Sequence, residues 1–277
     1  MRKDQVLGMI IGCAVGDAFG APYEFMAPED ITVTPKYTTG GIHGVGIGEW
    51  TDDTALMVAT MDAYIKYQGF NALAIADNFK EWLATGKFGT RDYVFDVGLT
   101  TKNAINNYTD DRPYASGAGK FASGNGSIMR IAPAIAANHK NTTQAIGEAV
   151  ACALLTHGNS DTVTYISAFV DEVINGKQYK HRDLRIHNVK QRHNTGSIMH
   201  SYNVAWWACH YGTGFDGAIV KAASLGYDTD TNCAVTGMLV GARNGIDDIP
   251  KEWIDKLQQK DMLFKMAEEM YEIGARE

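Results

Sequence analysis

The chain has 277 residues, of which 45% are apolar and 21% are charged, a composition typical of a globular protein with a sizeable core. A formal net charge of −7 argues against wholesale binding to nucleic acid or to an anionic membrane, and no stretch approaches the roughly 20 apolar residues of a membrane span. Four cysteines without a C-x-x-C pair indicate reduced thiols, so we expect a cytoplasmic protein.

The N-terminal apolar run carries a stripe of glycines. Glycine recurs at every fourth position, at Gly8, Gly12, Gly16 and Gly20. On a helix this spacing leaves one bare face, which lets another backbone or a ligand approach closely. A basic start followed by an apolar run also resembles a signal peptide, but Asp4 before the run and Asp17 just after it argue against that alternative.

Helical periodicity dominates the rest of the chain. Apolar residues recur at three- and four-residue spacing over residues 54–67, 71–84, 142–156, 160–174, 197–211, 215–225, 232–242 and 262–277. No convincing alternating run indicates a strand. The sequence therefore predicts an all-α fold, and the absence of a linker-like segment predicts one domain over residues 1–277.

Two long glycine-rich loops, residues 38–48 and 115–127, interrupt the helices, and such loops in compact domains often carry function. In the second loop, Gly124-Asn125-Gly126-Ser127 combines residues that tolerate left-handed backbone. Its N–H groups can then converge on one point, which suits a phosphate, although an ordinary turn before a helix is the alternative. The strongly basic residues 177–193 are interpreted as a solvated connector.

Two short acidic segments each precede an apolar helix. They are Thr51-Asp52-Asp53-Thr54 and Asp228-Thr229-Asp230-Thr231-Asn232. Helix capping is one interpretation, because Thr and Asp are favoured at an N-cap and in the first turn. Capping needs only one acceptor, however, and each segment supplies two carboxylates. If the two helix starts meet, four carboxylates crowd together, which costs stability unless a cation is present.

Carboxylate and hydroxyl oxygens suit hard cations such as Mg²⁺, Mn²⁺ or Ca²⁺, and a two-metal site accommodates so many acids. The second segment begins like a calcium loop, but Cys233 and Leu239 replace its required glycine and glutamate. Two single residues add to the pattern. Glu24 lies between aromatic residues, where its pKa is raised if it is buried, and a surface acid is the alternative. His157 ends an apolar helix, either as a functional group or as a cap or core residue.

In order along the chain, these features resemble the ADP-ribosylglycohydrolase family, which includes the glycohydrolase that reactivates dinitrogenase reductase. The motifs that carry the resemblance are Gly12–Ala18 with Gly20-Ala21-Pro22 and Glu24-Phe25, Gly48–Thr54, Asp96-Val97-Gly98 with Thr100-Thr101, Gly124–Arg130, Thr156-His157, Asp228–Asn232, and Ile249-Pro250 with Trp253. They cover nearly the whole chain in the family's order and spacing. The resemblance implies a compact, single-domain orthogonal helical bundle with two Mg²⁺ or Mn²⁺ ions in a cleft.

The resemblance also implies roles for individual residues. The metal ligands would be Thr51, Asp52, Asp53, Asp228, Asp230 and Thr231, of which Asp53 and Asp230 are also counted as catalytic. Glu24 would be the acid/base carboxylate, and Asp96 would lie near the leaving group. The contacts with the diphosphate and distal part of ADP-ribose would come from Asn125, Gly126, Ser127 and His157. Phe121 lies where the family places an adenine-stacking aromatic. Tyr227 replaces a frequent glycine and would narrow the cleft or stack on a ligand, with a surface substitution as the alternative.

The expected function is therefore metal-dependent hydrolysis of the glycosidic bond between ADP-ribose and a modified acceptor, with arginine on a protein as the default by resemblance. Serine, nucleic-acid ends and small metabolites stay open as acceptors. Two alternatives also stay open: an inactive module that binds ADP-ribose, and a metallohydrolase acting on another N- or O-glycoside or a phosphoester. We expect a monomer whose partner is an ADP-ribosylated protein or small molecule, without stable nucleic-acid or membrane binding.

Overall fold

The computed structural model describes residues 1–114, 119, 122–176 and 196–276. Over these residues the chain forms helices and no strands, with two isolated bridges that join Gly40 to Val45 and Gly124 to Ser197. The prediction of an all-α fold is confirmed. The basic segment 177–193 lies outside the described residues.

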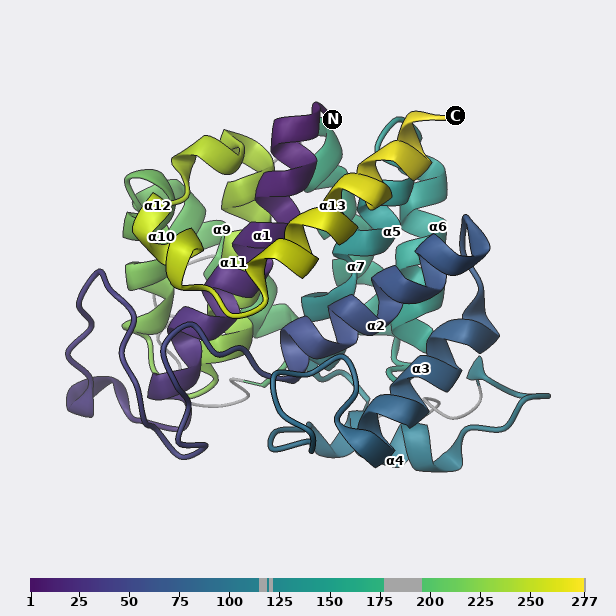
Figure 1. The fold of residues 1–277 in the computed structure, drawn as a ribbon, viewed down its shortest axis with the longest axis horizontal. Coiled ribbons are helices and arrows are strands. Elements are labelled where there is room, and N and C mark those ends of the chain that lie inside the picture. The colour runs from purple at the N-terminus through teal and green to yellow at the C-terminus, as the bar shows by residue number, and fades with distance from the viewer. Residues whose placement is uncertain (115–118, 120–121, 177–195, 277) are drawn as a thin grey trace.

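Helices of very different length follow one another along the chain (Figure 1). The α-helices are α1 (Lys3–Gly20), α2 (Asp52–Tyr67), α3 (Ala72–Thr85), α4 (Leu99–Asn107), α5 (Ala132–Ala137), α6 (Thr142–Leu154), α7 (Ser160–Asn175), α9 (Ile198–Tyr211), α10 (Gly214–Ala223), α11 (Thr229–Asn244), α12 (Lys251–Lys256) and α13 (Lys260–Ala275). The 3₁₀ helices are η1 (Ala21–Tyr23), η2 (Pro28–Asp30), η4 (Asn125–Arg130) and η5 (Ile246–Asp248).

Helix α1 forms the centre of the core and is buried continuously from Val6 to Gly20. By length and composition, the stretch Lys3–Tyr23 is long and apolar enough to cross a membrane, which the sequence analysis did not anticipate. Of its most apolar 18-residue window, 94% is buried inside the fold. Its apolar residues are covered by other helices, as expected for a central core helix.

The glycine stripe of α1 packs against α11, which runs antiparallel to it. A Cβ atom added at Gly16 would lie 2.1 Å from the carbonyl oxygen of Cys233, and one added at Gly237 would lie 2.0 Å from the carbonyl oxygen of Gly12. The close approach made possible by the stripe is therefore to another backbone. Because Gly20 faces Thr229, the C-terminal end of α1 lies beside the start of α11.

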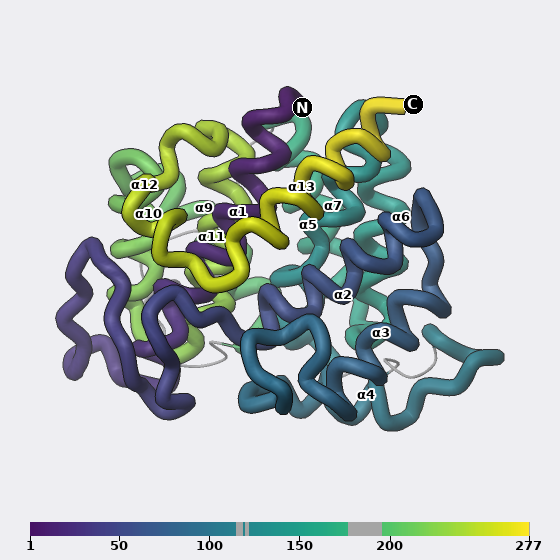
Figure 2. Tube along the Cα trace, viewed as in Figure 1, coloured from purple at the N-terminus to yellow at the C-terminus, as the bar shows by residue number. Residues whose placement is uncertain are grey.

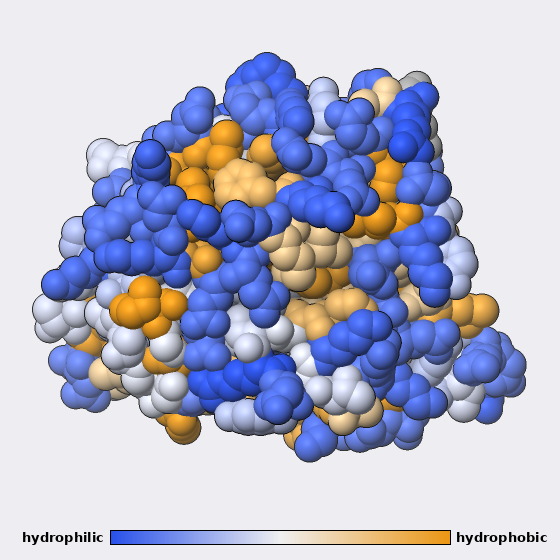
Figure 3. Space-filling model, in the orientation of Figure 1, coloured by the Kyte–Doolittle hydropathy of each residue, from blue (hydrophilic) through white to orange (hydrophobic). Residues whose placement is uncertain are grey.

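The remaining helices surround this central pair. Helix α13 packs across α1, α2 and α5, while α9 and α10 cover α11, and the tube in Figure 2 shows α13 crossing in front of α1. Hydrophilic residues dominate the face in Figure 3, where apolar residues form small separate patches. All four cysteines are free thiols, and Cys13, Cys152 and Cys233 are buried.

Candidate active site

The two acidic segments meet in space although they lie about 180 residues apart in the sequence. Thr51 Oγ1 lies 3.5 Å from Asp53 Oδ2 and 3.5 Å from Asp230 Oδ2. Thr231 Oγ1 lies 3.4 Å from the same Asp53 oxygen. The antiparallel packing of α1 and α11 places the start of α11 beside α2, so both helices direct their N-terminal ends into one acidic cluster.

Capping by the acidic segments themselves does not account for this arrangement. Neither Thr51 nor Asp228 forms a side-chain cap on its helix. Instead, Asp17 of α1 accepts hydrogen bonds from the Thr51 and Thr54 backbone N–H groups at 3.0 Å and from both hydroxyls, at 2.9 and 2.6 Å. A carboxylate from another helix thus accepts hydrogen bonds from the backbone N–H groups at the start of α2. Asp52 and Asp53 are therefore not needed to cap this helix.

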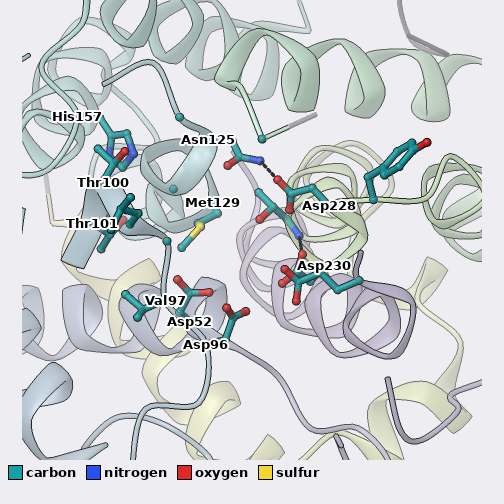
Figure 4. Close-up of a pocket in the computed structure, with 18 of the residues that line it drawn as sticks. Asp52, Asp96, Val97, Thr100, Thr101, Asn125, Met129, His157, Asp228 and Asp230 are labelled. Carbon is teal, nitrogen blue, oxygen red and sulfur yellow. Dashed lines mark hydrogen bonds between the residues drawn. The ribbon is translucent and has the colours of Figure 1, made fainter. Parts of the chain in front are cut away.

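The cluster opens into a cavity of about 490 Å³. Among the described residues, its walls include ten of the predicted site residues: Glu24, Asp52, Asp96, Asn125, Gly126, His157, Tyr227, Asp228, Asp230 and Thr231. Figure 4 shows Asp52, Asp96 and Asp230 gathered at one end and His157 with Thr101 at the other. Thr51, Asp53 and Ser127 are buried behind the walls, and Phe121 lies outside the described residues.

Burial and mutual repulsion destabilise the charged form of the clustered carboxylates. Removal from water raises the pKa values of Asp52, Asp53 and Asp230 well above the usual range, and the neighbouring acids raise them further. Asp53 Oδ1 is buried and has no hydrogen-bond partner among the described residues. A buried, unpaired carboxylate oxygen is costly, and a bound cation would relieve that cost.

The donor set fits a divalent metal. Asp52, Asp96 and Asp230 each offer an oxygen, and the three oxygens lie within 4.8 Å of one another. Glu24, Asp228 and Asp230 form a second group that meets the same limit. Carboxylate oxygens at this spacing are suitable ligands for hard divalent cations.

Glu24 contacts a residue that the sequence analysis did not single out. Its Oε2 lies 2.7 Å from Nε2 of His43, which belongs to the first glycine-rich loop. Burial raises the pKa of Glu24 to about 7, although the hydrogen bond to His43 opposes the shift. The hydrogen bond to Glu24 in turn raises the pKa of His43. Glu24 can therefore hold or release a proton near neutral pH, as an acid/base group must.

His157 lies at the opposite end of the cavity from the acids. Burial and the nearby Arg130 lower its pKa to about 3, so the ring is neutral. Thr156 Oγ1 accepts a hydrogen bond from the Arg130 guanidinium and lies 2.7 Å from His157 Nδ1. The other nitrogen of the neutral ring, Nε2, lies beside Gly124 and Gly126.

The loop at 124–127 differs from its predicted conformation. None of its residues has a positive φ, and η4 begins directly at Asn125. The Asn125 N–H is donated to the Gly196 carbonyl at 3.0 Å, so this amide does not contribute to an anion-binding nest. The Asn125 side chain donates to Asp228 Oδ2 at 2.7 Å and to Ser201 Oγ at 2.8 Å. Asn125 therefore fixes Asp228, and the pairing with residue 196 replaces the expected left-handed turn.

Comparison with known proteins agrees with this geometry. Residues 1–277 match the family model described as ADP-ribosylglycohydrolase. The chain belongs to the ADP-ribosylglycohydrolase family. It is thus a hydrolase that acts on glycosyl bonds.

Individual relatives span nearly the whole chain. ADP-ribosylarginine hydrolase Tri1 of Serratia proteamaculans is 28% identical over 99% of this chain and 81% of its own length. ADP-ribosyl-[dinitrogen reductase] glycohydrolase of Rhodospirillum rubrum is 29% identical over 93% of this chain and 91% of its own. A solved structure titled ADP-ribosylglycohydrolase-related protein complex has a TM-score of 0.83 at 26% identity and covers 98% of both chains. The fold is therefore that of an ADP-ribosylglycohydrolase.

The backbone at Tyr227 has a conformation that suits the glycine which the resemblance implies at this position. Tyr227 has φ +62°, a left-handed conformation that glycine adopts without strain. Its carbonyl accepts from Phe25 N–H at 2.6 Å, and its own N–H is donated to the Met26 carbonyl at 2.8 Å. These two bonds tie the segment after Glu24 to the start of α11. Tyr227 also lines the cavity and is partly exposed, so it is not simply a surface substitution.

The crowded acids predict an unusual pH dependence of stability in this ADP-ribosylglycohydrolase. Their folded-state pKa values are raised, so the folded state binds more protons than the unfolded state. In chelator, the melting temperature should therefore fall as pH rises from about 5 to about 8. Divalent cations bind carboxylates in their ionised form, so added Mg²⁺ or Mn²⁺ should raise the melting temperature more at the upper pH. Thermal melts at several pH values, with chelator or with metal, test this; a metal effect that is larger at low pH would contradict it.

Proposed function

We propose that this enzyme releases ADP-ribose from ADP-ribosyl-arginine on a protein, and that it requires Mg²⁺ or Mn²⁺. The observation that carries the proposal is the cavity that joins a crowded acidic end to an end with a neutral histidine. A volume of about 490 Å³ is in the range of cavities that hold small ligands. Arginine is the proposed acceptor because the Serratia proteamaculans relative is named an ADP-ribosylarginine hydrolase.

We propose that two metal ions are held by Thr51, Asp52, Asp53, Asp228, Asp230 and Thr231. When bound, such ions bind sugar hydroxyls and lower the pKa of a water molecule. The raised pKa values of Asp52, Asp53 and Asp230 and the unpartnered oxygen of Asp53 support this assignment. Asp17 and Asn125 would support the ligands, because they fix the start of α2 and the side chain of Asp228.

We assign the proton transfer to Glu24, whose pKa of about 7 lets it deliver a proton to the leaving group or accept one from water. The developing positive charge on the ribose would be stabilised by the surrounding carboxylates, and Asp96 would lie on the leaving-group side. At the other end, His157 and Gly126 would contact the diphosphate, whereas Ser127, which was expected to do so, is buried behind the wall. Arginine suits the acidic end of the cavity, because a guanidinium pairs with carboxylates.

Release of ADP-ribose from an ADP-ribosyl-arginine protein is the test of this proposal. We expect turnover with Mg²⁺ or Mn²⁺, none with chelator, and a loss of about 100-fold or more in kcat for Glu24→Gln, whose side chain cannot exchange a proton. Glu29→Gln, an exposed carboxylate in η2, is the matched control and should leave kcat unchanged.

Two other outcomes would support different functions. Binding of ADP-ribose by calorimetry without turnover on arginine-, serine- or nucleic-acid-linked substrates would identify an ADP-ribose-binding module. Turnover only on another glycoside or phosphoester would support a metallohydrolase and would exclude ADP-ribosyl-arginine as its substrate. We further propose that the enzyme is a cytoplasmic monomer, for which light scattering at micromolar concentration should give the mass of one chain.

A further inference from the structure

The Glu24 carboxylate depends on one neighbour for its position. The Glu24 backbone is anchored on both sides, by η1 before it and by the Phe25–Tyr227 hydrogen bond after it. Its side chain still has three torsions, and among the described residues the only hydrogen-bond partner of its carboxylate is His43, at 2.7 Å. Both side chains are largely buried, with 7% of Glu24 and 13% of His43 exposed.

The loop that carries His43 is itself held firmly. Reciprocal backbone hydrogen bonds of 2.9 Å between Gly40 and Val45 close it. The Arg91 guanidinium donates to the carbonyl oxygens of His43 and Gly44, both at 3.3 Å. Arg91 also forms an ion pair with Glu49 at 2.7 Å. The loop that carries the imidazole is thus held by hydrogen bonds from its own backbone and from Arg91.

Aromatic rings limit the rotation of the imidazole. The Phe25 ring lies 6.3 Å from it and the Phe95 ring 5.8 Å, both tilted. Arg91 lies over the Phe95 ring at 4.0 Å, so the same cation supports the loop and one of these aromatic walls. Asp96, the next residue, has an oxygen 3.8 Å from His43 Nε2.

We propose that His43 is a positioning residue, which holds the Glu24 carboxylate towards the cavity through the Nε2–Oε2 hydrogen bond. The bond forms with a single proton, which either the imidazole or the carboxylate can carry. The positioning role therefore does not require His43 to change its charge. Without the imidazole, the Glu24 side chain is free to adopt other rotamers, and correct placement of a catalytic group contributes strongly to rate. This inference rests on the proposed function of Glu24.

Three substitutions of His43 distinguish the effect of the hydrogen-bond position from the effect of side-chain size. Glutamine places an amide N–H near the position of Nε2, asparagine places one near Nδ1, and leucine provides volume without a donor. We expect His43→Leu and His43→Asn to lower kcat about 100-fold while KM and the Kd for ADP-ribose stay unchanged. His43→Gln should retain most of the activity. His210→Leu, away from the cavity, is the control and should leave kcat unchanged.

The double variant shows whether His43 acts through Glu24. Glu24→Gln with His43→Leu should be no slower than Glu24→Gln alone, because the positioned group is already lost. Multiplied losses, full activity of His43→Leu, or equal losses in all three His43 variants would each overturn the inference. Crystal structures of His43→Leu and His43→Gln decide it independently of turnover: we expect a displaced carboxylate only in the leucine variant. If the wild type releases no ADP-ribose, the proposed function fails, whereas an unmoved Glu24 in the leucine variant refutes the role of His43.

Discussion

Asp53→Asn is expected to lower kcat/KM for release of ADP-ribose by about three orders of magnitude, because loss of a metal ligand costs several kcal/mol of transition-state stabilisation. Asp53 Oδ2 faces the hydroxyls of both acidic segments, so it lies where α2 and α11 meet. Steady-state kinetics with saturating Mg²⁺ or Mn²⁺ give the rate, and calorimetry gives the metal affinity. Near-normal turnover in metal-containing buffer would refute the assignment.

The same substitution should not destabilise the metal-free protein. It replaces a buried carboxylate of raised pKa by an uncharged amide, so in chelator the variant should melt at or above the wild-type temperature. A loss of activity combined with a gain in stability distinguishes a missing ligand from a damaged fold. Asp161→Asn is the matched control, because it removes an exposed carboxylate from the first turn of α7. It should change neither turnover nor metal affinity.

Gly16→Ala is expected to lower the free energy of unfolding by about 3 kcal/mol or more, the upper range for an overpacked core. The added methyl group would lie 2.1 Å from the Cys233 carbonyl oxygen, and a backbone atom cannot move aside without separating the two helices. Those helices carry Asp17 and Asp230 at the same end of the contact, where Gly20 faces Thr229, so activity should fall with stability. Denaturant unfolding and kinetics on the same preparation measure both effects.

A second glycine provides the control for helix propensity. Gly147 of α6 is exposed and has no atom within 4 Å of an added Cβ. Gly147→Ala should therefore raise the free energy of unfolding by about 0.5–1 kcal/mol. If Gly16→Ala and Gly147→Ala changed stability alike, the close approach of α1 and α11 would not be a determinant of the fold.

Periodicity predicted most of the long helices because each buries one face and exposes the other. The predicted ranges for α3, α7 and α9 differ from the structure by no more than one residue at each end. Helix α11 begins at Thr229, three residues earlier than predicted, because the acidic residues form its first turn. The short helices α5 and α12 have six residues each, too few for a periodic pattern to be recognised.

The candidate site was predictable where neighbours in sequence act together. Both acidic segments, Glu24 and His157 were identified from local patterns, and all of them contribute to the cavity or its buried rear wall. Asp17 and His43 were not singled out, because each acts through a partner that only the folded chain brings near. The sequence did offer one signal for each residue. Asp17 is a carboxylate on an otherwise apolar helix, and His43 is a histidine in a glycine-rich loop.

The contact between α1 and α11 also constrains the order of folding. About 200 residues separate Gly16 from Cys233, so closing this contact requires nearly the whole chain to be present. During synthesis, α1 leaves the ribosome long before α11 is made, so the apolar surface of α1 stays exposed until α11 can pack against it. We therefore expect formation of this helix pair to be a late, slow step, which completes the acidic cluster only when the protein is nearly folded.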